Sequence, residues 1–231
     1  PTPPPPPPPS RKEGRRPTLE TLYRARHRDR QRKRYRWRRQ FTFDSTLGFP
    51  GEGHLGLMSW NAQGLNNLKA LTGMLRKAKT LEVDIIFVQE HKWPERSKKA
   101  KAALGVAKRA GYDMHCAHDG QGASKGGTAV LVRRHSAEVK VRGPSVKALG
   151  GRLCAVPVTI GEHHTRIVSV YAPVQARERL VFLKKLKSWI KKADIVGGDF
   201  NCVPDVARDQ SGNAGYPNRG GSLTEAIFST K

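Results

Sequence analysis

The sequence predicts an α/β fold with mixed strands and two packed sheets, preceded by an extended basic arm. Short apolar runs alternate with amphipathic helical segments from about residue 54 onward, the pattern of a layered α/β body. Glycine and proline separate successive runs, as they do at strand turns. Proline and arginine dominate the first 44 residues, which lack this alternation. We therefore divide the chain into an arm over 1–44, a linker over 45–53 and a partial domain over 54–231.

Hydrophobic spacing predicts the elements of this body. Strands are expected at 55–60, 83–90, 126–134, 151–160, 166–173 and 194–200. The second is apolar almost throughout, which is typical of a strand covered on both faces. Helices are expected at 68–78, 95–110 and 176–192, and a last one at 221–230. In the third helix the expected apolar stripe consists of Leu180, Leu183, Leu186, Trp189 and Ile190.

The arm combines a proline run with alternating arginines. The stretch PTPPPPPPPS favours polyproline II and is best interpreted as a stiff linker, docking to a proline-binding domain being the alternative. Arginine then occupies every even position from Arg24 to Arg38, so an extended chain places these guanidinium groups on one face. A solvated tail or a nuclear import signal is the alternative. We expect this segment to bind nucleic acid, with bases stacking on Trp37. The expected contact residues are Arg24, Arg26, Arg28, Arg30, Arg32, Lys33, Arg34, Arg36, Trp37, Arg38 and Arg39.

Charge and cysteine usage restrict the partners and the compartment. The chain holds 43 Lys and Arg against 19 Asp and Glu, a net charge of +24, which favours a polyanionic partner, nucleic acid before an anionic membrane surface. No apolar run reaches the ~20 residues that cross a bilayer, so no membrane partner is expected. Three scattered cysteines do not fit a disulfide framework. We expect an intracellular reducing compartment, either organellar (mitochondrial) or that of a nuclear or cytosolic ribonucleoprotein.

Polar side chains stand at the ends of the expected strands. Asn61 follows the first strand and Glu90 ends the second, Tyr171 ends a third, and Asp199 and Asn201 end the last. Because the strand ends of one sheet lie side by side, we expect these residues to converge. Oxygen donors without His or Cys suit a hard cation such as Mg²⁺, with phosphate oxygens completing its shell. A second carboxylate could then accept a proton from water, and a phenol could contact the phosphate. Each residue taken alone is also what a turn or a core would contain.

Five motifs carry a resemblance to a known family: SWNAQGL, IIFVQEHKW, GGTAVLV, VSVYAP and GGDFNCVPD. In this order they resemble the endonuclease/exonuclease/phosphatase superfamily of DNase I-like enzymes. GGDFNCV followed by DQSG is most similar to the endonuclease domains of non-LTR retrotransposons. The resemblance covers about residues 54 to 228 and implies a two-sheet α/β sandwich of the DNase I-like type, truncated at its C-terminus.

The resemblance also implies roles for individual residues. Asn61 and Glu90 would form the Mg²⁺ and phosphate network, and Tyr171 would contact the scissile phosphate. Asp199 would orient or deprotonate the attacking water, and Asn201 would hold that arrangement in place.

Several features depart from the family pattern or suggest other sites. Gln63 stands where several repair endonucleases carry Asp, and the SDH-like motif that ends the family is missing, so the implied site is incomplete on this chain. His91 is the only histidine near a motif. HCAH at 115–118 suggests zinc but lacks partner ligands. GQGASKGGT has Gly127 directly before Thr128, where a phosphate loop would need Lys, and is better interpreted as a turn leading into a strand.

Two functions of different classes remain open. The first is a nucleic-acid-binding pseudoenzyme, with RNA favoured over DNA, in a large ribonucleoprotein such as a ribosome, where protein partners cover the truncated sheet. The second is an active Mg²⁺-dependent endonuclease that hydrolyses DNA phosphodiester bonds, of the retrotransposon or apurinic/apyrimidinic type. A phosphoesterase for lipid or nucleotide second messengers shares the fold but leaves the arm unexplained. The missing motif and the basic arm favour the first.

Overall fold

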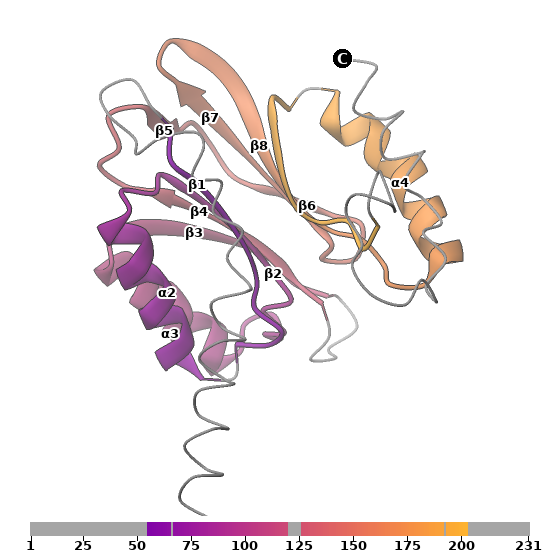
Figure 1. The fold of residues 1–231 in the computed structure, drawn as a ribbon, viewed down its shortest axis with the longest axis horizontal. Helices are drawn as coiled ribbons and strands as arrows, with labels where there is room; N and C mark the ends of the chain where they lie inside the picture. The colour runs from indigo at the N-terminus through magenta and orange to yellow at the C-terminus, as the bar shows by residue number, and fades with distance from the viewer. Residues whose placement is uncertain (1–54, 66, 120–125, 192, 203–231) are drawn as a thin grey trace, which may run out of the picture. The chain divides into compact units, whose positions relative to one another are not determined.

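Two mixed β-sheets pack face to face, and helices cover their outer sides (Figure 1). This computed structural model describes residues 55–65, 67–119, 126–191 and 193–202, all of which belong to one compact unit. The expected arm over 1–44, the linker and the last helix at 221–230 lie outside the described residues.

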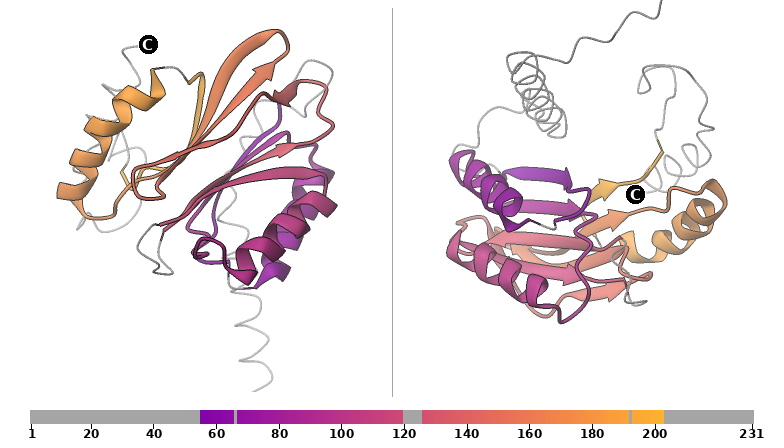
Figure 2. Two further views of the ribbon diagram at one scale, coloured as in Figure 1. Left: turned by 180° about the vertical axis from the view of Figure 1, so that it is seen from behind. Right: turned by 90° about the horizontal axis from the view of Figure 1, so that it is seen from below.

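The first sheet has the strand order β1-β2-β4-β3. Its strands are β1 (Leu57–Asn61), β2 (Ile85–Gln89), β4 (Thr128–Arg133) and β3 (Tyr112–Ala117). β1 and β2 are parallel, and α2 (Leu68–Thr80) connects them. α3 (Lys98–Arg109) connects β2 to β3. Both helices pack an apolar face on the outer side of this sheet (Figure 2).

The second sheet has the order β5-β7-β8-β9, and β6 also pairs with β7. Its strands are β5 (Val139–Val141), β6 (Val146–Ala148), β7 (Leu153–Ile160), β8 (His163–Tyr171) and β9 (Ile195–Asp199). β8 and β9 are parallel, joined through α4 (Ala176–Ile190) on the outer face. Each sheet therefore contains one parallel pair connected by a helix.

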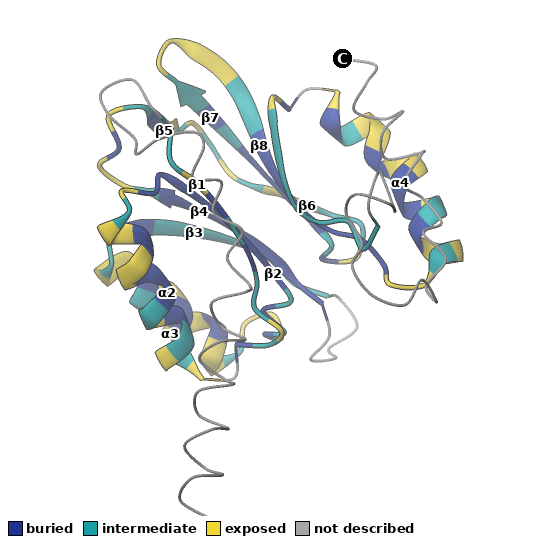
Figure 3. Cartoon of the chain, viewed as in Figure 1, coloured by how far each residue is buried: buried dark blue, intermediate teal, exposed yellow. Residues whose placement is uncertain are grey.

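The core between the sheets explains their close packing. Ile85, Phe87 and Val130 of the first sheet meet Val156 and Ile167 of the second in one buried cluster. The strand β2 is buried at every position, which confirms the prediction of a strand covered on both faces. Figure 3 shows the buried residues concentrated along the facing strands.

A glycine permits a close approach between the two sheets. A Cβ added to Gly197 of β9 would lie 2.5 Å from the ring of Phe87. A side chain at this position would therefore force β9 away from β2, and with it the residues that follow β9.

The six expected strands and three of the expected helices are present, with shifted boundaries. α3 begins at Lys98 rather than at residue 95, because the Ser97 side chain accepts a hydrogen bond from the backbone N–H of Ala100 and so caps the helix. Three strands were not expected: β3, β5 and β6. The first mixes polar and sulfur-containing side chains at a half-buried edge, and the other two have only three residues each.

The expected apolar stripe of the last described helix is partly wrong. Leu183, Leu186 and Ile190 are buried, but Leu180 and Trp189 are only half-buried. The buried face also includes Phe182 and Arg179. The guanidinium of Arg179 donates to the carbonyls of Pro173 and Val174 at 3.4 and 2.6 Å, which satisfies this buried cation.

No helix in the part of the chain that the structure describes is long and apolar enough to cross a membrane.

Candidate active site

Four strands, two from each sheet, end at the same edge of the sandwich. The parallel pairing of β1 with β2 brings Asn61 beside Gln89, the residue before Glu90. The parallel pairing of β8 with β9 brings Tyr171 beside Asp199. The predicted residues converge, although they do not all belong to one sheet: two parallel pairs, one in each of the two expected sheets, turn their carboxyl ends to one edge.

Asn61 links two carboxylates across the two sheets. Its Nδ2 donates to Glu90 Oε1 at 3.1 Å and to Asp199 Oδ2 at 2.8 Å. Its Oδ1 accepts from the backbone N–H of Gln63 at 3.0 Å. The Gln63 main chain therefore orients the amide, and this contact is available to any residue type at that position.

Glu90 is held as an anion by three donors. Oε1 accepts from Asn61 and from the Tyr171 hydroxyl, the latter at 3.0 Å. Oε2 lies 3.1 Å from Lys92 Nζ. Burial raises the pKa of Glu90, but the hydrogen bonds from Asn61, Lys92 and Tyr171 together outweigh burial and leave the pKa below its usual value. Glu90 is therefore ionised at neutral pH, as a cation ligand must be.

Tyr171 is a proton donor rather than a base. Its side chain is buried, and burial together with the neighbouring Glu90 carboxylate raises the pKa of Tyr171 to about 12. The guanidinium of Arg152 lies 5.1 Å from the centre of the phenol ring, and its Nη1 donates to the Tyr171 carbonyl at 3.4 Å. A protonated phenol backed by a cation is suited to hydrogen bonding with an anionic group.

Asp199 is fixed through both carboxylate oxygens. Oδ2 accepts from Asn61, and Oδ1 accepts from the backbone N–H of Asn201 at 2.9 Å. The side chain of Asn201 donates to the carbonyl of Ala172 at 2.7 Å. Asn201 thus ties the end of β9 to the end of β8, and it contacts Asp199 through its main chain.

Backbone strain is concentrated around these residues. Of the seven non-glycine residues with positive φ in the described ranges, four lie here: Gln63 at 49°, Glu90 at 54°, Lys92 at 56° and Asn201 at 50°. Such conformations persist only where the surroundings fix them. The N–H of Gly64 donates to the Glu90 carbonyl at 2.7 Å, which joins the loops after β1 and β2.

His91 has a structural role. It is fully buried and stacks on Trp93 with ring centres 4.8 Å apart. The N–H of Trp93 donates to Nδ1 at 3.1 Å, so Nε2 carries the proton and donates to the Ala117 carbonyl at 3.1 Å. A Cβ added to Gly127 would lie 2.4 Å from the ring. His91 therefore has no nitrogen available to the carboxylates.

This burial predicts a pH dependence of stability. Burial and the neighbouring His118 lower the pKa of His91 from 6.5 to about 4. The unfolded chain therefore takes up the proton first, so stability is retained above pH 6.5 and falls by about 3 kcal/mol as the pH drops to 4. Urea unfolding across this range should show the loss in the wild type and a shallower one in His91→Gln, whose amide can replace both hydrogen bonds. Equal losses in His91→Gln and in the exposed control His164→Gln would contradict the assignment.

The other two features noted in the sequence are also structural. His115 and Cys116 are consecutive in β3 and point to opposite faces, and His118 Nδ1 lies 2.9 Å from the Trp93 carbonyl. Among the described residues, no three His, Cys, Asp or Glu side chains form a metal-binding group. Gly126 and Gly127 adopt φ of 62° and 84° and lead directly into β4, in line with a turn before a strand; residues 120–125 lie outside the described ranges.

The donor set at the strand ends consists of oxygen atoms, which suit a hard divalent cation. The carboxylates of Glu90 and Asp199 share one hydrogen-bond donor, the Asn61 amide, so two carboxylates and an amide lie together at this edge. Mg²⁺ is usually bound by one or two carboxylates, with water and phosphate oxygens completing its shell. Lys92 and Arg152, which the sequence analysis did not select, add positive charge beside the carboxylate and the phenol.

A sandwich of two mixed sheets with helices outside, carrying polar residues at a shared strand edge, is the DNase I-like α/β fold. The chain belongs to the endonuclease/exonuclease/phosphatase family, whose model matches residues 58–221.

Two solved structures illustrate the likeness in fold. An AP endonuclease from Archaeoglobus fulgidus is 17% identical with a TM-score of 0.55, over 77% of this chain and 71% of that one. An AP endonuclease from Leishmania major is 17% identical with a TM-score of 0.54, over 76% of this chain and 66% of that one. No curated protein sequence matches the chain. The closer likeness to retrotransposon endonucleases stays a prediction.

Proposed function

We propose that the chain is a divalent-metal-dependent phosphodiester hydrolase that acts on nucleic acid as an endonuclease. The observation that carries this proposal is the Asn61 amide, which holds the carboxylates of Glu90 and Asp199 together across the two sheets at 3.1 and 2.8 Å. A scaffold that only bound nucleic acid would have no need for this arrangement. The strained backbone at Glu90 and Asn201 supports the same conclusion.

The residues of the site divide the chemistry among them. Glu90 and Asn61 would hold Mg²⁺, which when bound would neutralise charge on the phosphate oxygens. Asp199 is oriented through both oxygens and retains lone pairs that can accept a proton from the attacking water. Tyr171, protonated at neutral pH, would turn its single hydroxyl proton from Glu90 Oε1 to the phosphate and donate a hydrogen bond there.

Charge supports nucleic acid as the substrate class. The chain carries +24, and we assign the alternating arginines between Arg24 and Arg38 to the nucleic-acid backbone. The alternative, a catalytically silent RNA-binding component of a ribonucleoprotein, rests on two expectations from the sequence, the basic arm and the missing SDH-like motif, and nothing in the described residues supports a ribosomal role. DNA is the first substrate to test.

The test is nicking of supercoiled plasmid and of a duplex with one abasic position, with Mg²⁺ and with EDTA. We expect nicking that requires the metal and saturates with substrate, and a preference for the abasic duplex would place the activity in the apurinic/apyrimidinic class. Tight, salt-sensitive binding without cleavage of either DNA would contradict the proposal and support the scaffold alternative.

Arg152 should contribute to this activity through Tyr171. Arg152→Ala removes the cation beside the phenol ring, and we expect kcat/KM for nicking to fall by about 2- to 30-fold, the range of a cation–π contact. Arg152→Lys should restore little, because an ammonium lacks the planar group that stacks on the ring. The exposed Arg142→Ala is the control for lost positive charge. Equal losses in Arg152→Ala and Arg142→Ala would mean that only net charge matters.

A further inference from the structure

The two helices on the first sheet form a basic layer without acidic residues. α2 carries four Lys or Arg residues and α3 carries five, all of them exposed, and neither helix contains Asp or Glu. The helices lie side by side on the outer face of the sheet (Figure 2). Helices of this kind lack the acid–base pairs that normally offset repulsion along an exposed face, so a bound polyanion would relieve it.

One end of this layer is hollowed into a basic pocket, defined by Lys79, Arg109, Tyr112, Arg133 and His135 and about 220 Å³ in volume. Lys79 lies in the last turn of α2, Arg109 ends α3, Arg133 ends β4 and His135 follows it. Among the described residues, no carboxylate lines the pocket. Four basic side chains from separate elements thus surround one hollow large enough for a phosphate group.

Helix capping accounts for only part of this arrangement. Cations in the last turn of a helix offset its dipole, which is sufficient reason for Lys79 and Arg109. It does not explain Arg133 and His135, which come from a strand and the loop after it. Asp84 lies 4.0 Å from Arg133 and also accepts a hydrogen bond from the backbone N–H of Gly56 at 3.0 Å, so Arg133 shares this carboxylate. Lys79 and Arg109 have no acidic partner among the described ion pairs.

The basic pocket lies at the end of the sheet opposite the candidate active site. Val132, the residue before Arg133, pairs with Ile85 at the start of β2, whereas Glu90 follows the end of β2. A strand of this length spans about 17 Å, which corresponds to about five nucleotide steps of B-form DNA. A phosphate in the basic pocket is therefore a different one from the phosphate at Glu90.

We propose that the basic pocket binds a backbone phosphate of nucleic acid, at a second binding site that is distinct from the candidate active site. Arg109 and Arg133 offer planar forks of donors to the phosphate oxygens, and Lys79 adds a point charge. The adjacent basic face of α2 and α3 would extend the contact to further phosphates of the same nucleic-acid strand. This site goes beyond the proposed hydrolase function and holds whether or not the chain cleaves its ligand.

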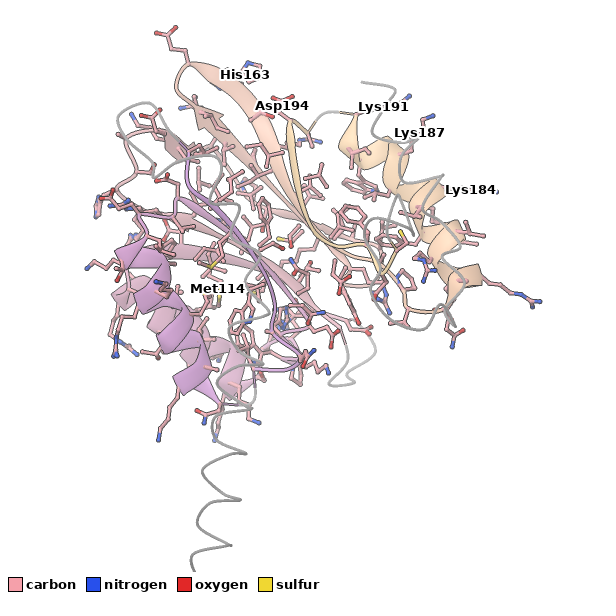
Figure 4. All side chains as sticks on the ribbon, in the orientation of Figure 1. Met114, His163, Lys184, Lys187, Lys191 and Asp194 are labelled. Atoms are coloured by element: carbon pink, nitrogen blue, oxygen red, sulfur yellow. The ribbon has the colours of Figure 1, made fainter. Side chains whose placement is uncertain are left out.

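The first experiment is lysine acylation of the full chain, read by mass spectrometry, with and without a 30-base-pair duplex in EDTA. Lys184 and Lys187 of α4 and Lys191, which follows the helix, point outward (Figure 4) and serve as internal references, called the α4 lysines below. We expect the duplex to slow acylation of Lys79 several-fold and to leave the α4 lysines unchanged. Equal protection of Lys79 and the α4 lysines, or none at either, would overturn the proposal.

The second experiment measures duplex affinity by fluorescence anisotropy at several salt concentrations, again in EDTA. Loss of the one phosphate contact of the pocket in Lys79→Ala/Arg109→Ala should flatten the slope of log K against log salt by about 0.9. The matched variant Lys184→Ala/Lys187→Ala loses the same charge from α4 and should keep the wild-type slope. Identical slopes in the two variants would reduce the effect to general surface charge. Because no cleavage occurs in EDTA, failure of the proposed hydrolase function would leave this result intact.

Discussion

Asp199→Asn should reduce metal-dependent nicking by about 10²- to 10⁴-fold, the usual contribution of a positioned acid or base, while DNA affinity stays within a few-fold of wild type. The amide cannot accept a proton from water at neutral pH. In the wild type both carboxylate oxygens of Asp199 accept hydrogen bonds, one from the Asn61 amide and one from the Asn201 N–H. The NH₂ group of the introduced Asn would therefore face one of these two donors and lose that hydrogen bond. Single-turnover nicking and fluorescence anisotropy separate the two effects.

Asp194→Asn is the matched control for this substitution. Asp194 precedes the same strand, is exposed, and contacts His163 at 2.7 Å at the end of the sheet away from Asp199 (Figure 4). It should nick at the wild-type rate. Wild-type rates in Asp199→Asn as well would exclude Asp199 as the base and, with it, the assignment of the active site.

Glu90→Gln should lower nicking by a comparable factor through a different cause, the loss of metal binding. The neutral amide keeps an oxygen for Asn61 and Tyr171 but loses the charge that faces Lys92, 3.1 Å away. We expect the activity to return partly at high Mg²⁺ concentration, because affinity rather than the chemical step is impaired. Asp199→Asn should not recover in this way.

Thermal unfolding provides a readout of metal binding that does not depend on activity. A ligand that binds only the folded state raises the melting temperature with its concentration, so Mg²⁺ should stabilise the wild type and the exposed control Glu178→Gln, but not Glu90→Gln. An equal Mg²⁺ shift in Glu90→Gln would place the cation elsewhere.

The sequence predicted which residues stand at strand ends better than it predicted how those strands are arranged in space. Asn61, Glu90, Tyr171 and Asp199 each follow or end an apolar run, and that pattern was sufficient to select them. The division of those runs between two sheets depends on which strands pair, and pairing is a long-range property that hydrophobic periodicity does not encode. The burial of β2 on both faces, in contrast, could be predicted from its own residues, because they form an almost continuous apolar run.

Single basic residues in loops were beyond sequence reasoning. Lys92 and Arg152 are two among 43 Lys and Arg residues, and neither stands in a pattern. Arg152 reaches Tyr171 because β7 pairs with β8, which places Leu153 beside Val170. His91 is the only histidine near a motif, but the chain turns at Glu90 with a φ of 54° and the His91 imidazole is buried in the core.

The division of the candidate site between two sheets has a consequence for how activity is acquired during folding. The contact between Asn61 and Asp199 joins residues 138 positions apart, and closing so long a loop is slow relative to forming the local β1-α2-β2 unit. Neither half of the sandwich holds both carboxylates by itself. In a refolding experiment, secondary structure should therefore return first, and nicking should recover only in the phase in which β9 docks beside β2.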